Sequence, residues 1–345
     1  MTYQHWRESK TVRRSFAAMA VASLGLLAAC GTGSPSTTAA GGSGSTSSGP
    51  ITIAFNMGAE ADPFFISMNE GAKAAATKYG VKLIWQGDPS VYSPSTQIPI
   101  ANQLLAQHPS GFIIAPTDPA ALQSIVNQAV RQGIPVVNVD THVNDLSHVL
   151  SFITGNNQQG GAAAAQAMAA DLHYSKGKTY QVAVGASSAT TTTNTARYQG
   201  FKAEVAAKYP GIQIVSEAYS QSQPAVANTN VNNWLTKYPH LSGIFAIDGT
   251  NASGASAAVQ SRGLTGKVAL VGYDAYSTNV ALLQKHVFAA LVAQQPYTEG
   301  YMAVSDVVNY LRHHTKPQHL VTLPNIVLTP ASSSSLLTKY TYPSA

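Results

Sequence analysis

The chain has 345 residues, of which 45% are hydrophobic, so it is long enough to bury a sizeable core and to form two domains. Its formal net charge is +5, but four of the 20 Lys and Arg and one of the 15 Asp and Glu lie in residues 1–29, so the remainder carries +2. No basic run interleaved with aromatic residues remains, which argues against a nucleic-acid partner. Cys30 is the only cysteine, which excludes a disulfide within the chain and a thiolate metal cluster.

Residues 1–29 have the pattern of a secretion signal. An apolar run over residues 16–29 follows a basic stretch, whose charged residues include Arg7, Lys10, Arg13 and Arg14. The run is shorter than the roughly 20 residues that a membrane-spanning helix needs. We therefore predict a removable signal peptide over 1–29 rather than a retained membrane anchor. The pair Arg13-Arg14 also resembles a twin-arginine signal, so the route of export stays open.

The signal ends in Leu27-Ala28-Ala29-Cys30, which resembles a bacterial lipobox. The resemblance implies that Cys30 is lipidated and becomes the first residue of the exported protein, anchored by lipid to the outer face of the cell membrane or facing the periplasmic space. An ordinary signal with a chance cysteine is the alternative. The next residues read GTGSPSTTAAGGSGSTSSGP, without charge and almost without apolar bulk, so we predict that 30–50 is the lipidated cysteine and a flexible linker.

From residue 51 onward, short β-rich runs alternate with longer alanine-rich runs. The first helical run, 63–79, places Phe64, Met68, Ala72 and Ala75 at spacings of three and four. The predicted strands are 51–57, 81–86, 111–115, 135–140, 149–154, 180–184, 212–215, 243–248, 268–273 and 289–293. The predicted helices are 63–79, 95–107, 119–132, 158–172, 195–208, 224–237, 252–262, 277–285 and 298–312.

This alternation predicts an α/β fold with parallel sheets covered by helices on both faces. The strands are nearly continuous apolar runs, as expected when both faces are buried. Asp62-Pro63 and Asp118-Pro119 have the pattern of an N-cap followed by proline at the first helical position. Ten strands are too many for one ordinary doubly wound unit, so we expect two doubly wound lobes. Ligands of such sheets bind beyond the carboxyl ends of the strands, and a cleft between lobes is a preferred place.

Seven short motifs at these junctions resemble the periplasmic sugar-binding proteins of ABC importers of the ribose-binding type, the type I solute-binding proteins. They occur in the right order and are Asp62-Pro63-Phe64-Phe65, Ala115-Pro116-Thr117-Asp118, Val139-Asp140-Thr141, Arg197-Tyr198-Gln199-Gly200-Phe201, Ile244-Phe245-Ala246-Ile247-Asp248, Val271-Gly272-Tyr273-Asp274 and Ala293-Gln294-Gln295-Pro296. The resemblance covers essentially all of residues 51–330.

The resemblance implies two lobes joined by a three-strand hinge that close around a ligand. Carried onto this chain, the first lobe is 51–154 with 295–326 and the second is 155–294 with 327–345. The implied partners are a small-molecule sugar or polyol, an ABC permease and its ATPase, and the membrane through the lipid anchor. We expect a monomer, with no catalytic residues, no metal site and no cofactor.

The predicted ligand-binding residues combine aromatic faces with groups that bind hydroxyls. Phe64 and Phe65 offer rings to the C–H face of a sugar. Carboxylates accept hydrogen bonds from neighbouring hydroxyls, and an arginine offers a fixed fork of donors. The remaining predicted site residues are Asp62, Asp140, Arg197, Asp248, Asp274 and Gln294. For the phenylalanines core packing is the alternative, and for Asp62, Asp140, Asp248 and Asp274 it is a helix N-cap.

The departures from the ribose-type pattern make the predicted pocket more acidic. Thr141 stands where that pattern has an arginine, and Asp62 and Asp248 stand where it has amides. Ala115 replaces an asparagine, and Gln221 falls near the place of a stacking aromatic. We therefore expect another pentose, a hexose, a polyol, inositol or an amino sugar in place of ribose, and no acid.

Two other classes of protein, enzymes and transcription regulators, agree less well with this sequence. An enzyme is not indicated, because the sequence has no G-x-S-x-G elbow, P-loop or H-E-x-x-H motif. A lactose-repressor type regulator would need an N-terminal helix-turn-helix where this chain has the signal and linker. A lipoprotein that presents a sugar-like signal to a membrane receptor stays open as the alternative to transport.

Overall fold

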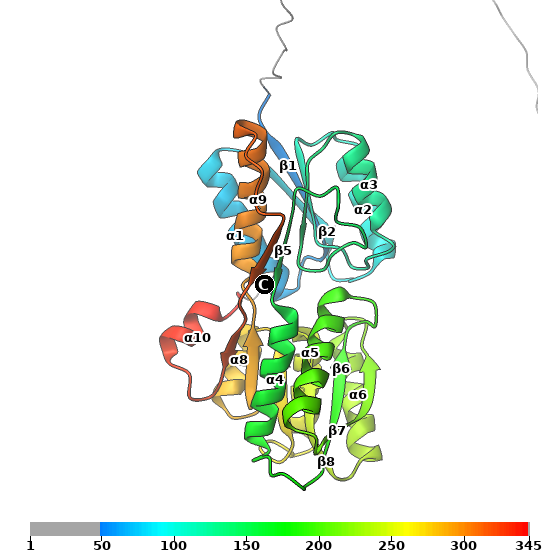
Figure 1. The fold of residues 1–345 in the computed structure, drawn as a ribbon, viewed down its shortest axis with the longest axis vertical. Coiled ribbons are helices and arrows are strands. Elements are labelled where there is room, and N and C mark those ends of the chain that lie inside the picture. Colours follow the sequence, from blue (N-terminus) through cyan, green and yellow to red (C-terminus); the bar gives the residue numbers. More distant parts are fainter. Residues whose placement is uncertain (1–48, 344–345) are drawn as a thin grey trace, which may run out of the picture. The chain divides into compact units, whose positions relative to one another are not determined.

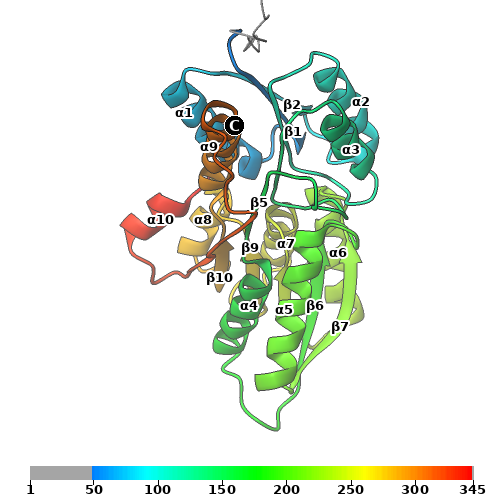
Figure 2. The ribbon, with the colours of Figure 1, turned by 45° about the horizontal axis from the view of Figure 1, so that its top comes forward.

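The structure is a computed structural model and describes residues 49–343. Within that range the chain forms two six-stranded sheets covered by helices (Figures 1 and 2). The signal peptide, Cys30 and nearly all of the predicted linker lie outside the described residues. The α/β fold class with two parallel-sheet lobes is confirmed.

The first sheet has the strand order β11-β5-β4-β3-β1-β2, and every pair in it is parallel. Its strands are β1 (Thr52–Ala59), β2 (Lys82–Asp88), β3 (Gly111–Ile114), β4 (Val136–Val139), β5 (Ser151–Gly155) and β11 (Leu320–Leu323). Its helices are α1 (Pro63–Tyr79), α2 (Pro94–Leu105), α3 (Gln123–Arg131) and α9 (Pro296–His313). We call this sheet with its helices the first lobe.

The second sheet has the order β12-β10-β9-β8-β6-β7, with only β12 antiparallel to its neighbour. Its strands are β6 (Tyr180–Ala186), β7 (Ile212–Tyr219), β8 (Leu241–Ala246), β9 (Ala269–Tyr273), β10 (Ala290–Ala293) and β12 (Ile326–Leu328). The helices of this second lobe are α4 (Asn157–Asp171), α5 (Thr192–Lys208), α6 (Pro224–Lys237), α7 (Gly249–Ser261), α8 (Ser277–Gln284) and α10 (Ser334–Tyr340).

Side-chain alternation along the strands explains why each sheet is buried on both faces. In β1, Ile53 and Phe55 belong to the core beneath α1 and α9, whereas Ala54 belongs to the core beneath α2 and α3. Figure 1 shows these two helix pairs on opposite sides of the first sheet. Each fully buried aliphatic or aromatic side chain of this kind contributes roughly 1.5–3 kcal/mol, so both layers are needed to stabilise a lobe.

The chain passes between the two sheets three times: from β5 to α4, from β10 to α9 and from β11 to β12. The three passages lie together, because Asn325 Nδ2 donates to the carbonyl of Asn156 and Gln295 Nε2 donates to that of Pro324. Ile326 pairs with Ala293 of the second sheet, although the predicted first lobe extends through residue 326. The other limits of the two lobes stay a prediction.

Most predicted helices begin and end within three residues of their observed limits, and α1 has the predicted bounds. The predicted start of α3 was wrong, because the helix begins at Gln123 and not at Pro119. Asp118 Oδ1 instead accepts from the amides of Ala120 and Ala121, so its cap closes a separate turn before the helix. Three short elements, β11, β12 and α10, were not predicted.

Close packing of α1 against α9 generates a stability prediction. A Cβ atom added at Gly71 would lie 1.9 Å from the carbonyl oxygen of Tyr297, so the two helix backbones touch there. In Gly71→Ala, overpacking should lower the free energy of unfolding by about 1–3 kcal/mol. The higher helix propensity of alanine should offset ~1 kcal/mol of that loss. Urea unfolding measures the loss, with the exposed Lys73→Ala on the same helix as control. A Gly71→Ala variant as stable as this control would contradict the packing.

Candidate functional site

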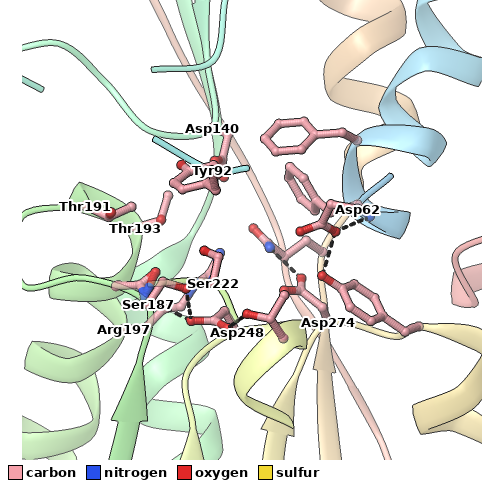
Figure 3. A pocket seen from close by; sticks show the side chains of 16 residues that line it. Asp62, Tyr92, Asp140, Ser187, Thr191, Thr193, Arg197, Ser222, Asp248 and Asp274 are labelled. Carbon is pink, nitrogen blue, oxygen red and sulfur yellow. Dashed lines mark hydrogen bonds between the residues drawn. The ribbon is translucent and has the colours of Figure 1, made fainter. Parts of the chain in front are cut away.

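A pocket with about 450 Å³ of empty space, including space open to solvent, lies where the carboxyl ends of the two sheets face each other. Figure 3 shows Asp140 and Tyr92 on one side of it and Asp248 and Asp274 on the other. All eight predicted ligand-binding residues line this pocket. The full lining is Asp62, Phe64, Phe65, Tyr92, Asp140, Ser187, Thr191, Thr193, Asn194, Arg197, Ser222, Asp248, Thr250, Asp274, Tyr276 and Gln294.

The junction of β1 and α1 brings Asp62, Phe64 and Phe65 to the pocket. Asp62 is the N-cap of α1, and its Oδ1 accepts from the Phe64 amide at 2.9 Å. The two phenylalanine rings meet edge to face with their centroids 5.3 Å apart, and both are buried. They therefore belong to the core of the first lobe and also form a wall of the pocket, so core packing and ligand contact are compatible here.

Asp140 and Asp274 occupy equivalent positions in the two lobes. Each directly follows a central strand, β4 or β9, and each has a left-handed backbone with φ of 59° and 66°. Their amides donate at 2.9 Å to the carbonyls of Ile153 and Val292 on the next strands. Aspartate tolerates this conformation better than most residues, but at some conformational cost. Such strain at matched strand ends is typical of functional positions.

Arg197 is held in place by groups other than carboxylates. Its Nε donates to Asn157 Oδ1 at 2.8 Å, its Nη1 donates to the Ile247 carbonyl at 3.0 Å, and its guanidinium lies 3.9 Å above the Tyr273 ring. Within residues 49–343 no carboxylate oxygen lies within 4.0 Å of it, since the single ion pair there is Lys208–Glu204. Nη2 makes no hydrogen bond to the described part of the chain.

The carboxylates differ in how far their oxygens are already occupied. Asp248 caps α7, and both of its oxygens accept from neighbours, which are Ser187, Asn194, Thr250 and Asn251. Asp274 accepts from Gln294 Nε2 at 2.7 Å and from the Gly249 amide at 3.0 Å. Within residues 49–343, the carboxylate of Asp140 has a single, long hydrogen bond of 3.4 Å from Thr141 Oγ1. The oxygens of Asp248 are therefore occupied by neighbours, whereas Asp140 keeps the most unoccupied acceptor capacity among these carboxylates.

Burial dominates the protonation of these groups. Burial raises the pKa of Asp62 to about 7, although hydrogen bonds from Tyr276 and Phe64 lower it. Burial also raises the pKa of Asp140 to about 6, and the charge of Arg197 opposes that rise. The pKa of Asp274 is raised for the same reason, again against the charge of Arg197. A ligand that supplies hydroxyl donors would favour the ionised carboxylates.

Half of the lining was not predicted from the sequence. Tyr92 comes from the loop after β2, where its ring lies nearly parallel to that of Phe65, with centroids 6.3 Å apart. Tyr276 follows Asp274 by two residues and points back to Asp62. The other unpredicted residues are Ser187, Thr191, Thr193, Asn194, Ser222 and Thr250. A run of four threonines, 190–193, was the one available signal for Thr191 and Thr193.

Over residues 49–343 the structure contains no group of three or more His, Cys, Asp or Glu side chains that could hold a metal ion. In the same range no helix has the length and apolar character needed to cross a membrane.

The sequence profile of a periplasmic binding protein domain matches residues 53–315. The chain belongs to this family. It is a solute-binding protein of the ribose type rather than an enzyme, as its sequence motifs indicated.

Its relatives include the ribose import binding protein RbsB of Bacillus subtilis, 27% identical over 91% of this chain and 98% of the relative. The D-ribose/D-allose-binding protein of Pseudomonas aeruginosa is 28% identical over 77% of this chain and 84% of its own length. Among solved structures, an ABC transporter solute-binding protein from Agrobacterium vitis, bound with alpha-D-tagatopyranose, has a TM-score of 0.80 at 28% identity. The match covers 85% of this chain and 99% of the chain in that structure.

The raised pKa values generate a pH prediction for this binding protein. The folded chain holds the proton of Asp62 more tightly than the unfolded chain, whose carboxyl has the ordinary pKa of 3.8. The resulting stabilisation is complete below 3.8 and is lost as the pH rises through about 7. Asp62→Asn cannot ionise, so its unfolding temperature should fall less than that of the wild type over this range. Circular dichroism melts without sugar measure the slope.

The control is Glu70→Gln, which removes an exposed carboxyl group from the same helix and should keep the wild-type slope. Identical slopes for Asp62→Asn and the wild type would show that folding does not raise the pKa of Asp62.

Proposed function

We propose that this protein binds a monosaccharide or a small polyol between its two lobes and delivers it to an ABC importer. The observation that carries the proposal is a pocket that combines two aromatic rings with uncommitted carboxylate and guanidinium atoms. Sugars have an apolar C–H face and a rim of hydroxyls, so they match both kinds of surface. A monosaccharide ligand is supported by the solved structure with bound tagatopyranose and by a second structure, from Agrobacterium radiobacter, in complex with D-arabinose.

The balance of charge favours a neutral or weakly cationic ligand. Four aspartates line the pocket, and Arg197 is the only Lys or Arg among its lining residues. An acidic ligand would be repelled by these carboxylates, and the strength of that repulsion increases in a poorly solvated cleft. Hydroxyl groups can donate to Asp140 and Asp62, while Arg197 Nη2 can donate to a ligand oxygen.

A thermal-shift screen of pentoses, hexoses, polyols, inositols and amino sugars tests the binding proposal, because a ligand specific for the folded state raises its stability. Calorimetry then compares the best neutral sugar with its amine, its uronic acid and its phosphate. Asp140→Ala should weaken binding of the best ligand at least about tenfold, because a buried partner is left unpaired. Asp274→Ala should weaken binding by a similar factor.

The exposed Glu70→Gln serves as a control for general effects on the first lobe. Tightest binding to the uronic acid or the phosphate would contradict the proposed ligand class. Unchanged affinity in folded Asp140→Ala would remove that residue from the site. Uptake of the identified sugar by cells with and without the protein separates delivery to an importer from presentation to a receptor.

We also propose that Cys30 is the lipidated first residue of the exported protein, on the strength of the sequence Leu27-Ala28-Ala29-Cys30. Two or more acyl chains would anchor the protein stably at the membrane. The exported protein should partition into detergent and have the mass of an acylated chain that begins at Cys30. Cys30→Ala should move it into the aqueous phase. An aqueous wild-type protein that still begins at Met1 would contradict this proposal.

A further inference from the structure

Hydrogen bonds join the two lobes on either side of the pocket. The hydroxyl of Tyr276 in the second lobe donates to Asp62 Oδ1 in the first lobe at 2.6 Å. Thr190 Oγ1 of the second lobe donates to Asp118 Oδ2 of the first at 2.9 Å, among exposed residues. Thr141 and Thr193, and the His142 amide and Thr192 Oγ1, also bond between the lobes, at 3.3 and 3.2 Å. Among these four contacts, only the bond between Tyr276 and Asp62 joins side chains that both line the pocket. The described structure therefore has the lobes closed, with this bond inside the site.

Two neighbours confine the ring of Tyr276. A Cβ atom at Gly249, the first residue of α7, would lie 2.2 Å from the ring, so only glycine leaves room for it. The ring of Tyr342 lies 6.2 Å away, and Tyr276 and Tyr342 also form a backbone bridge. Tyr276 is only 6% exposed. This packing restricts the ring of Tyr276 and so fixes the position of its hydroxyl within the second lobe.

The two carboxylate oxygens of Asp62 differ in their hydrogen bonds. Its Oδ1 accepts from the Phe64 amide as the helix cap, and in the closed arrangement it also accepts from Tyr276 (Figure 3). No donor within residues 49–343 bonds its Oδ2. The closed pocket therefore offers a ligand one oxygen of Asp62, not the pair that a free carboxylate would present.

We propose that Tyr276 is a selectivity residue that couples closure of the lobes to the shape of the ligand. This proposal rests on the proposed function. Because the two partners belong to different lobes, their bond forms only on closure, and its free energy adds to the binding of any ligand that leaves it intact. A sugar or polyol that directs one hydroxyl to Asp62 Oδ2 satisfies this condition. A ligand with a substituent between Asp62 and Tyr276 prevents the bond and binds more weakly.

Tyr276→Phe tests the proposal, because it keeps the ring and its packing against Gly249 and removes only the hydroxyl. The affinity for the best sugar of the screen should fall about tenfold, a typical effect of losing a hydrogen bond to a charged group. Thr190→Ala, which removes a different bond between the lobes at an exposed site, should change the affinity less than about twofold. Calorimetry measures both variants.

Two further measurements distinguish coupling from a general structural effect. In a double-mutant cycle, Tyr276→Phe should have little effect once Asp62→Ala has removed the acceptor. In the wild type the hydrogen bond from Tyr276 lowers the pKa of Asp62. Without this bond the pKa should rise, so the pH at which acidification halves the sugar affinity should be higher in Tyr276→Phe than in the wild type. Additive effects in the cycle together with an unmoved pH profile would overturn the proposal.

The failure of this proposal can be told apart from failure of the proposed function. If no sugar or polyol binds, the proposed function fails. Small-angle scattering of the unliganded wild type and Tyr276→Phe then tests whether the bond between Tyr276 and Asp62 favours the closed arrangement of the lobes. A wild type more compact than Tyr276→Phe would support its role in closure, and equal dimensions would overturn it.

Discussion

The pocket depends on one constraint, the burial of several carboxylates with a single guanidinium. Parallel strands direct their carboxyl ends to the same edge, and two such edges face each other here, so Asp140 and Asp274 meet across the site. Their left-handed backbones, at φ of 59° and 66°, are tolerated because the adjacent strands hold both amides. Arg197 favours ionisation of both groups through space and without direct contact, so it occupies none of their oxygens.

Hydrogen-bond saturation separates Asp248 from the other carboxylates of the pocket. Asp248 is surrounded by side-chain and backbone donors and also caps α7, so it fixes the start of that helix and the positions of Ser187 and Asn194. Asp62 and Asp140 have few donors and raised pKa values. All three were predicted to bind the ligand, with Asp62 and Asp248 standing where the ribose-type pattern has amides, whereas their contacts in the structure differ.

The fold was predictable because its signals are local, whereas much of the site was not. Continuous apolar strands, the cap at Asp62 and the glycine after α1 each leave a mark within a few residues. The edge strand β11 has four residues, two of them exposed, and leaves no such mark. The bond between Tyr276 and Asp62 joins positions 214 residues apart, so no spacing in the sequence could reveal it. The role of each predicted site residue in binding stays a prediction.

Glu299 shows how the protein limits the negative charge around this site. It lies in the first turn of α9 and is fully buried, and neither of its carboxyl oxygens has a hydrogen-bond partner within the described range. Burial raises its pKa well above the ordinary value, and the charges of Asp140 and Asp274 act in the same direction. An unpaired buried carboxylate costs more free energy than a neutral acid, which favours the protonated form of Glu299. A protonated Glu299 adds no charge to the site. The charge of the pocket is therefore set by its lining aspartates and Arg197, which are also the groups that a ligand can reach.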